Sequence, residues 1–146
     1  MKYKNLNKYI FSSFLLFSSS AMAKSTMTSC EIDTPVIVEV SRCLDGIKEQ
    51  KERELQTWIN NQTFILEALA ANNGRHAALN MFKRSQRNFI SYRENNCRWQ
   101  YLVVSPAPGA AVAFKKCFIT LTQDRIEELS KLNGQKVPTK PTIYNG

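Results

Sequence analysis

The sequence has few of the residues with which enzymes carry out catalysis. Among its 146 residues there is one histidine, His76, and there are five glycines. A Ser-His-Asp triad needs a histidine held by a carboxylate in a dry pocket, whereas His76 lies beside a polar turn with few acids near it in sequence. Three of the glycines serve turns or ends, so a glycine-rich phosphate loop is absent. We therefore predict no catalytic residues and a protein that is not an enzyme.

Long apolar runs are also missing. The stretch from Ile10 to Phe17 is shorter than the ~20 residues of a membrane span, and no other stretch approaches that length. It lies within residues 1–23, which contain three lysines, no acid and a final Ala21-Met22-Ala23. A basic start, a short apolar middle and a small-x-small end are typical of a secretory signal peptide. We expect cleavage after Ala23, a periplasmic protein without membrane insertion, a folded domain over residues 24–133 and a flexible tail over 134–146.

The chain has no excess of acidic residues. Lys and Arg number 20 against 12 Asp and Glu, which gives a formal net charge of +8. The three lysines of residues 1–23 would leave with the signal peptide, so the mature chain carries +5. In an exported protein, this mild charge does not favour nucleic acid as a partner.

Four cysteines, Cys30, Cys43, Cys97 and Cys117, all lie after the predicted signal peptide. Their spacings of 13, 54 and 20 residues provide none of the close pairs that structural metal sites use. An even number of cysteines in a small exported domain is typical of disulfides. We therefore predict two disulfides, no metal site and no cofactor.

Apolar residues recur at three- and four-residue steps through most of the mature chain, which is the period of one helix face. Thr34-Pro35 is a favourable helix start, Gly46 is a candidate break, and Asn72-Asn73-Gly74 is a stop signal. Residues 24–33 are expected to be irregular, and no alternating pattern demands a sheet. The fold class predicted is all-α, a small antiparallel bundle of about three helices stapled by two disulfides. These helices cover about residues 34–71, 75–101 and 110–133.

Two disulfide patterns fit this bundle. If the second and third helices fold back on each other about residues 105–109, Cys97 and Cys117 lie at similar heights. That arrangement favours Cys97–Cys117 with Cys30–Cys43. The nested pattern, Cys30–Cys117 with Cys43–Cys97, is nearly as well supported because the first helix also runs antiparallel to the second. The sequence leaves both patterns open.

Charged and apolar residues also indicate which helix faces are buried. The run Lys48–Glu54 places opposite charges four residues apart, Lys48 with Glu52 and Glu49 with Arg53, which predicts a solvated face. In the second helix the predicted core stripe consists of Ala78, Phe82, Ser85, Phe89, Tyr92 and Trp99.

Arg93 occupies an unusual position in the second helix. Helical spacing places it on one stripe with Gln86, Ile90 and Cys97, at the edge of the core. A guanidinium there must be paired, so we expect a carboxylate or helix-end carbonyls from the first or third helix to contact it. The preferred interpretation is a structural ion pair that fixes how the helices pack.

The residues around Arg93 also form the densest motif in the chain, which resembles the LprI type of small exported helical proteins. That family's motif reads roughly Gln-Arg-x-Trp-x-x-Tyr-Arg-Asp-x-x-Cys, then a glycine-bearing loop, a further cysteine and Leu-Thr-x-x-Arg-x-x-x-Leu. The resemblance covers about residues 86–129 well, with Phe89 in place of the tryptophan and Glu94 in place of the aspartate. The motif residues, most of which look like fold determinants, are Gln86, Arg87, Phe89, Tyr92, Arg93, Glu94, Cys97, Gly109, Cys117, Leu121, Thr122, Arg125 and Leu129.

The resemblance implies lysozyme inhibition, and therefore a protein partner. We expect a periplasmic binding protein that occludes the cleft of a lysozyme-like enzyme, with a less basic target favoured because a +5 inhibitor gains no steering toward a basic one. Two alternatives stay open, an immunity protein against a secreted muramidase toxin and a non-inhibitory structural or assembly protein of the envelope. A homodimer is also left open. The predicted partner-binding loop, which two prolines rigidify, consists of Ser105, Pro106, Ala107, Pro108 and Gly109.

Overall fold

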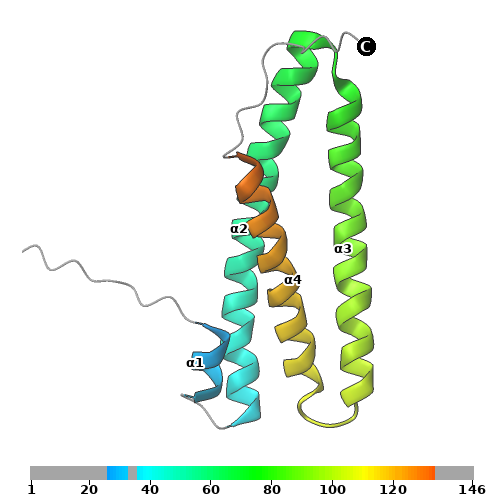
Figure 1. Cartoon of the computed structure of the whole chain (residues 1–146). Coiled ribbons are helices and arrows are strands. Elements are labelled where there is room, and N and C mark those ends of the chain that lie inside the picture. Colours follow the sequence, from blue (N-terminus) through cyan, green and yellow to red (C-terminus); the bar gives the residue numbers. More distant parts are fainter. Residues whose placement is uncertain (1–25, 33–35, 134–146) are drawn as a thin grey trace, which may run out of the picture.

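The computed structural model describes residues 26–32 and 36–133, and the regular structure in this part of the chain is entirely α-helical (Figure 1). The helices are α1 Met27–Ile32, α2 Ile37–Asn73, α3 His76–Val104 and α4 Ala110–Asn133. The all-α prediction is therefore confirmed. None of the described helices is both long enough and apolar enough to cross a bilayer. The predicted signal peptide (1–23), the predicted tail (134–146) and the predicted helix start at Thr34-Pro35 lie outside the described residues.

Helices α2 and α3 form a long antiparallel hairpin (Figure 1). Because α2 has 37 residues, it extends for about 55 Å. It ends at Gly74, whose φ of 70° lies in the left-handed region that glycine adopts without steric cost, and the Gly74 N–H donates to the Ala70 carbonyl at 3.0 Å. Helix α4 folds back along both long helices but ends part-way up, so the α2–α3 turn lies beyond it (Figure 1).

The chain before α2 differs from the prediction of an irregular leader, because Met27–Ile32 form the short helix α1. Thr26 and Ser29 cap its first turn reciprocally. The Ser29 N–H donates to Thr26 Oγ1 at 3.2 Å, and the Thr26 N–H donates to Ser29 Oγ at 3.1 Å. This exchange satisfies two amides at a helix start, as in a capping box. Six residues are too few for a periodic pattern to reveal the helix.

The candidate helix break at Gly46 is wrong, because α2 continues through it without interruption. Glycine in a helix interior costs about 1 kcal/mol relative to alanine. The flanking Leu44 and Ile47 are buried in the core, and their packing offsets that cost.

Replacing Gly46 with alanine is expected to raise the free energy of unfolding by about 0.5–1 kcal/mol, because the unfolded chain loses freedom and helix propensity improves. A Cβ at this position meets no atom within 4 Å. Urea unfolding followed by circular dichroism measures the change. Gly74→Ala is the matched control and is expected to destabilise the protein, since alanine is strained at a φ of +70°. A lower stability of Gly46→Ala would contradict the expectation.

The core consists of three clusters, and α4 contributes to each. The first contains Cys30, Val40, Leu44, Ile47, Val112 and Ile119. The second contains Cys97, Cys117 and Phe118. The third contains Leu55, Ile126 and Leu129, with Trp58, Ile59, Phe82 and Phe89 packed against it. Helix α4 is therefore the element around which α2 and α3 are held together.

Two disulfides join the helices, as predicted, and their pattern is Cys30–Cys43 with Cys97–Cys117. The nested alternative is wrong. The turn between α3 and α4 is short, so Cys97 and Cys117 lie opposite each other with their Cα atoms 5.5 Å apart. Helix α1 folds back onto the start of α2, which brings the Cα atoms of Cys30 and Cys43 to 5.7 Å.

The predicted core stripe of α3 is only partly correct. Phe82 and Phe89 pack against the core, but Ala78, Ser85, Tyr92 and Trp99 are exposed. The buried residues of α3 are Gln86, Arg93 and Cys97. This buried stripe is narrower and more polar than the predicted one, because the disulfide of Cys97 and the ion pair of Arg93 hold it against the other helices. Ile90 lies beside the stripe and is half-exposed.

Candidate functional site

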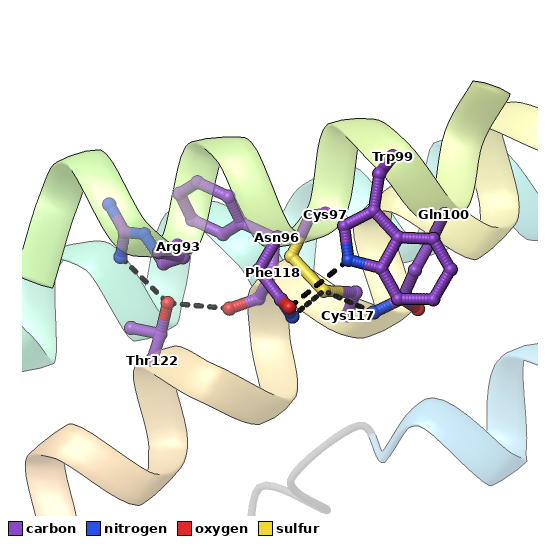
Figure 2. Close-up of a disulfide and its surroundings, with 8 residues drawn as sticks. All are labelled: Arg93, Asn96, Cys97, Trp99, Gln100, Cys117, Phe118 and Thr122. Carbon is purple, nitrogen blue, oxygen red and sulfur yellow. Dashed lines mark hydrogen bonds between the residues drawn. A yellow bond between two sulfur atoms is a disulfide. The ribbon is translucent and has the colours of Figure 1, made fainter.

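The guanidinium of Arg93 joins all three long helices. Figure 2 shows its contact with Thr122 of α4. The Arg93 side chain, on α3, is 4% exposed. Nη1 donates to Glu52 Oε2 of α2 at 2.8 Å and to Thr122 Oγ1 of α4 at 2.7 Å, while Nη2 donates to Glu52 Oε1 at 3.1 Å. The group also stacks on Phe118, with 3.7 Å between its central carbon and the ring centroid. Two parallel charge-assisted hydrogen bonds and an aromatic face are a geometry that arginine, but not lysine, provides.

The prediction that Lys48–Glu54 form a solvated face is wrong in part. Glu52 contacts Arg93 instead of Lys48, and the Lys48 ammonium lies 4.7 Å from the centroid of the Phe118 ring. Lys51 is largely buried and pairs with Glu54 at 2.8 Å. Glu49 and Arg53 do form the expected exposed pair, at 3.9 Å. A buried guanidinium binds a carboxylate more strongly than an exposed helix neighbour does, so the contact between helices prevails.

A second polar cluster lies one to two turns from Arg93, toward the start of α3. Arg125 of α4 donates from Nε to Gln86 Oε1 at 3.4 Å and from Nη2 to Ser85 Oγ at 2.9 Å, and it pairs with Glu128 at 2.5 Å. Phe89 lies near both guanidinium groups, 5.3 Å from that of Arg93 and 5.7 Å from that of Arg125. The structure thus brings five of the motif residues together, namely Gln86, Phe89, Arg93, Thr122 and Arg125.

Two other motif residues lie apart from this cluster. Tyr92 is exposed on the outer face of α3, and Glu94 pairs with Arg98 at 3.2 Å on the surface. His76 is exposed at the first turn of α3. Within residues 26–32 and 36–133, no group of three His, Cys, Asp or Glu residues lies close enough to hold a metal ion.

The predicted partner-binding residues, 105–109, form the turn at one end of the molecule (Figure 1). Its backbone is hydrogen-bonded to itself. The N–H of Ser105 donates to the Tyr101 carbonyl at 2.9 Å, that of Ala107 to Val104 at 3.0 Å and that of Ala110 to Ala107 at 3.0 Å. The Cys97–Cys117 disulfide ties the two flanking helices together about two turns away.

A feature that the motif analysis missed surrounds this turn. No charged residue occurs from Trp99 through Phe114, although charged residues flank the run at Arg98 and Lys115. Leu102 and Val103 are exposed apolar residues directly before the turn. We call residues 102–109 the tip. A count of charges along the chain would have found it.

Two shallow hollows lie on the surface of α3 and α4, between the tip and the residues that surround Arg93. We call those residues the Arg93 cluster. One has a volume of about 310 Å³ and is lined by Arg98, Tyr101, Ala111, Phe114 and Lys115. The other has a volume of about 380 Å³ and is lined by Asn96, Gln100, Ala113, Lys116, Cys117, Thr120 and Leu121. Both lie on helix surfaces, so neither could be recognised from spacing alone.

Comparison with known proteins finds one family. The family model described as "Lysozyme inhibitor LprI" matches residues 21–129, which include all four cysteines, the Arg93 cluster and the tip. No curated protein and no solved structure matches the chain. The family's description is that of an inhibitor, which binds an enzyme and is not one itself. Since the match covers most of the sequence, the chain belongs to the LprI family of lysozyme inhibitors.

Proposed function

We propose that the protein inhibits a lysozyme-like enzyme by inserting the tip into the enzyme's substrate cleft. The observation that carries the proposal is an exposed, uncharged and apolar turn at one end of the helical bundle. Glycan-cleaving enzymes hold their substrate in a concave groove, which a turn between two helices can enter. In this proposal the Arg93 cluster stabilises the bundle that carries the tip and does not contact the target.

The tip is suited to binding because its backbone loses little conformational freedom when it associates with a target. Its turn is hydrogen-bonded internally, Pro106 and Pro108 restrict its backbone, and the Cys97–Cys117 disulfide holds its two helices together. Association costs about 0.5–1.5 kcal/mol for each flexible side chain that it immobilises, so a braced element loses less affinity. Burial of Leu102 and Val103 would each contribute about 1.5–3 kcal/mol at most.

Charge also suits the tip to such a cleft. Lysozyme-like enzymes place paired carboxylates around the bond that they cleave. The tip has no acidic residues, so those carboxylates do not repel it. It also has no basic residues, so no charged group must be desolvated when it binds. The net positive charge of the chain favours a target that is less basic than the inhibitor.

The setting that we propose is the bacterial periplasm. Both disulfides require an oxidising compartment, and the predicted signal peptide would direct the chain there. An inhibitor in this place protects the cell wall either from an external lysozyme or from a muramidase toxin delivered by a competitor. The second case is an immunity function, and it uses the same surface.

The proposal is tested by placing a charge on the tip. Val103→Asp is expected to raise the inhibition constant at least tenfold, because a carboxylate at the interface must be desolvated close to the carboxylates of the enzyme. Inhibition is measured as the rate of cell-wall lysis by a panel of lysozymes that includes bacterial muramidases.

Phe64→Asp is the matched control. Phe64 lies on the far half of α2 and is 72% exposed, against 74% for Val103, so both variants replace an exposed apolar side chain by the same acid. The control is expected to inhibit like the unmodified protein. Equal inhibition by the two variants would show that the tip does not enter the cleft.

A further inference from the structure

The hollow of about 380 Å³ between α3 and α4 is lined by apolar surface together with three neutral polar residues, Asn96, Gln100 and Thr120. The exposed Trp99 adjoins it through its hydrogen bond to Asn96. We call it the amide hollow, after Asn96 and Gln100. Figure 2 shows Trp99, Asn96 and Gln100 around the Cys97–Cys117 disulfide. None of these three side chains takes part in the Arg93 cluster, and none belongs to the tip.

Trp99 is held in place while much of its surface stays in water. Its Nε1 donates to Asn96 Oδ1 at 3.2 Å, which fixes the direction of the ring. The residue is nevertheless 55% exposed. Indole rings usually bury their apolar faces, so one that is oriented and uncovered is a platform on which another flat apolar surface can stack.

The two carboxamides keep most of their hydrogen-bonding capacity. Asn96 Nδ2 and Gln100 Nε2 both donate to Cys117 Sγ, at 3.6 and 3.3 Å. Sulfur is a weak acceptor, and each amide nitrogen carries a second hydrogen. Within the described residues, Gln100 Oε1 accepts no side-chain hydrogen bond. The amides are thus oriented by the disulfide yet available to a ligand.

We propose that the amide hollow binds a chain of N-acetylated amino sugars. A pyranose ring has one face of C–H groups, which can lie on the Trp99 indole, while its hydroxyl and acetamido groups bond to the carboxamides of Asn96 and Gln100. Thr120, an exposed residue, adds a hydroxyl group to the lining. The volume falls at the small end of ligand sites, which corresponds to one or two rings of a longer chain.

The charges of the lining favour a neutral glycan over other ligands. It contains no acidic residue, and its one basic group, Lys116, is paired with Glu31 of α1. A phosphorylated or nucleic acid ligand would require free cations. A peptide anchor would require a deep apolar pocket, whereas the hollow is shallow and two carboxamides share its lining with the apolar groups.

This site goes beyond inhibition of a lysozyme and does not depend on it. Lysozymes cleave a polymer of N-acetylated amino sugars, so a protein that also binds the polymer is concentrated where the enzyme acts. Two contacts joined in one assembly raise apparent affinity without strengthening either contact.

The test uses the full chain and no lysozyme. The sequence has two tryptophans, so Trp58→Phe leaves Trp99 as the only indole reporter. Titration with the tetramer of N-acetylglucosamine is expected to change the Trp99 emission saturably, and calorimetry gives the dissociation constant. Trp99→Ala is expected to weaken binding at least tenfold by calorimetry. Tyr92→Ala, which removes an equally exposed aromatic residue about two turns of α3 from Trp99, is expected to leave binding unchanged.

Several outcomes would overturn the proposal. They are the absence of binding at ~10 mM tetramer, equal binding by Trp99→Ala and Tyr92→Ala, and equal binding of a glucose tetramer that lacks acetamido groups. Thr120→Arg fills the hollow from an exposed position and must also weaken binding. Val103→Asp should bind the sugar normally, so failure of the tip proposal and failure of this one are distinguishable.

Discussion

Replacing Arg93 with alanine is expected to lower the free energy of unfolding by about 3 kcal/mol, because the change removes charge-assisted hydrogen bonds and an aromatic stack inside the bundle. Removal of one partner from a fully buried ion pair costs about 3–5 kcal/mol, since the other charge is left unpaired. Here Glu52 is 49% exposed and can be solvated, so the lower end of that range applies. Thr122 keeps its hydrogen bond to the Phe118 carbonyl. Urea unfolding measures the loss.

Two variants control for this experiment. Arg93→Lys keeps the charge but cannot donate in parallel to both oxygens of Glu52, so it is expected to recover only part of the stability. Arg53→Ala removes an arginine from an exposed pair on α2 and is expected to change stability by less than about 0.5 kcal/mol. If Arg93→Ala unfolded like the unmodified protein while inhibition was lost, Arg93 would be a contact residue and not a structural one.

Removing the Cys97–Cys117 disulfide is expected to be equally destabilising and to weaken inhibition as well. In the chain-entropy model, a bridge that spans 20 residues contributes about 3 kcal/mol. The same bridge braces the tip, so its loss lets α3 and α4 separate where the target is contacted. We expect Cys97→Ala with Cys117→Ala to raise the inhibition constant at least tenfold at a temperature where the variant is still folded.

The other disulfide provides the comparison. Cys30–Cys43 spans 13 residues, so its entropic contribution is similar. It joins α1 to α2 and so does not tie together the two helices that flank the tip, and α1 is short enough to open locally without unfolding the bundle. Cys30→Ala with Cys43→Ala is therefore expected to lose stability and to keep inhibition. Loss of inhibition in both double variants alike would show that bracing of the tip is not the cause.

The ends of the long helices could be predicted because particular residues mark them. Asn72-Asn73-Gly74 and Ser105-Pro106-Ala107-Pro108-Gly109 coincide with the two turns of the bundle. Helix α1 could not be predicted from periodicity, although the Thr26 and Ser29 pair is a capping signal that was available. Gly46 was a misleading signal because tertiary packing of Leu44 and Ile47 outweighs helix propensity.

The buried face of α3 shows why the rest was harder to predict. Periodicity selects the most apolar stripe, which contains Tyr92 and Trp99, whereas the structure buries Gln86 and Arg93. A buried polar stripe is stable only when partners from other helices satisfy it, and Glu52 lies 41 residues away in sequence. The amide hollow likewise depends on how α3 and α4 pack side by side. Such contacts between distant residues leave no periodic trace.

The disulfide pattern has a consequence for how the protein matures. Each cysteine is bonded to its immediate neighbour in chain order, the first with the second and the third with the fourth. A chain that emerges N-terminus first presents Cys30 and Cys43 before the later pair exists, and then Cys97 and Cys117 after the first pair is consumed. An oxidase that joins thiols in order of appearance therefore makes the native bonds directly. The protein can mature without a disulfide isomerase, which a nested pattern would require under the same conditions.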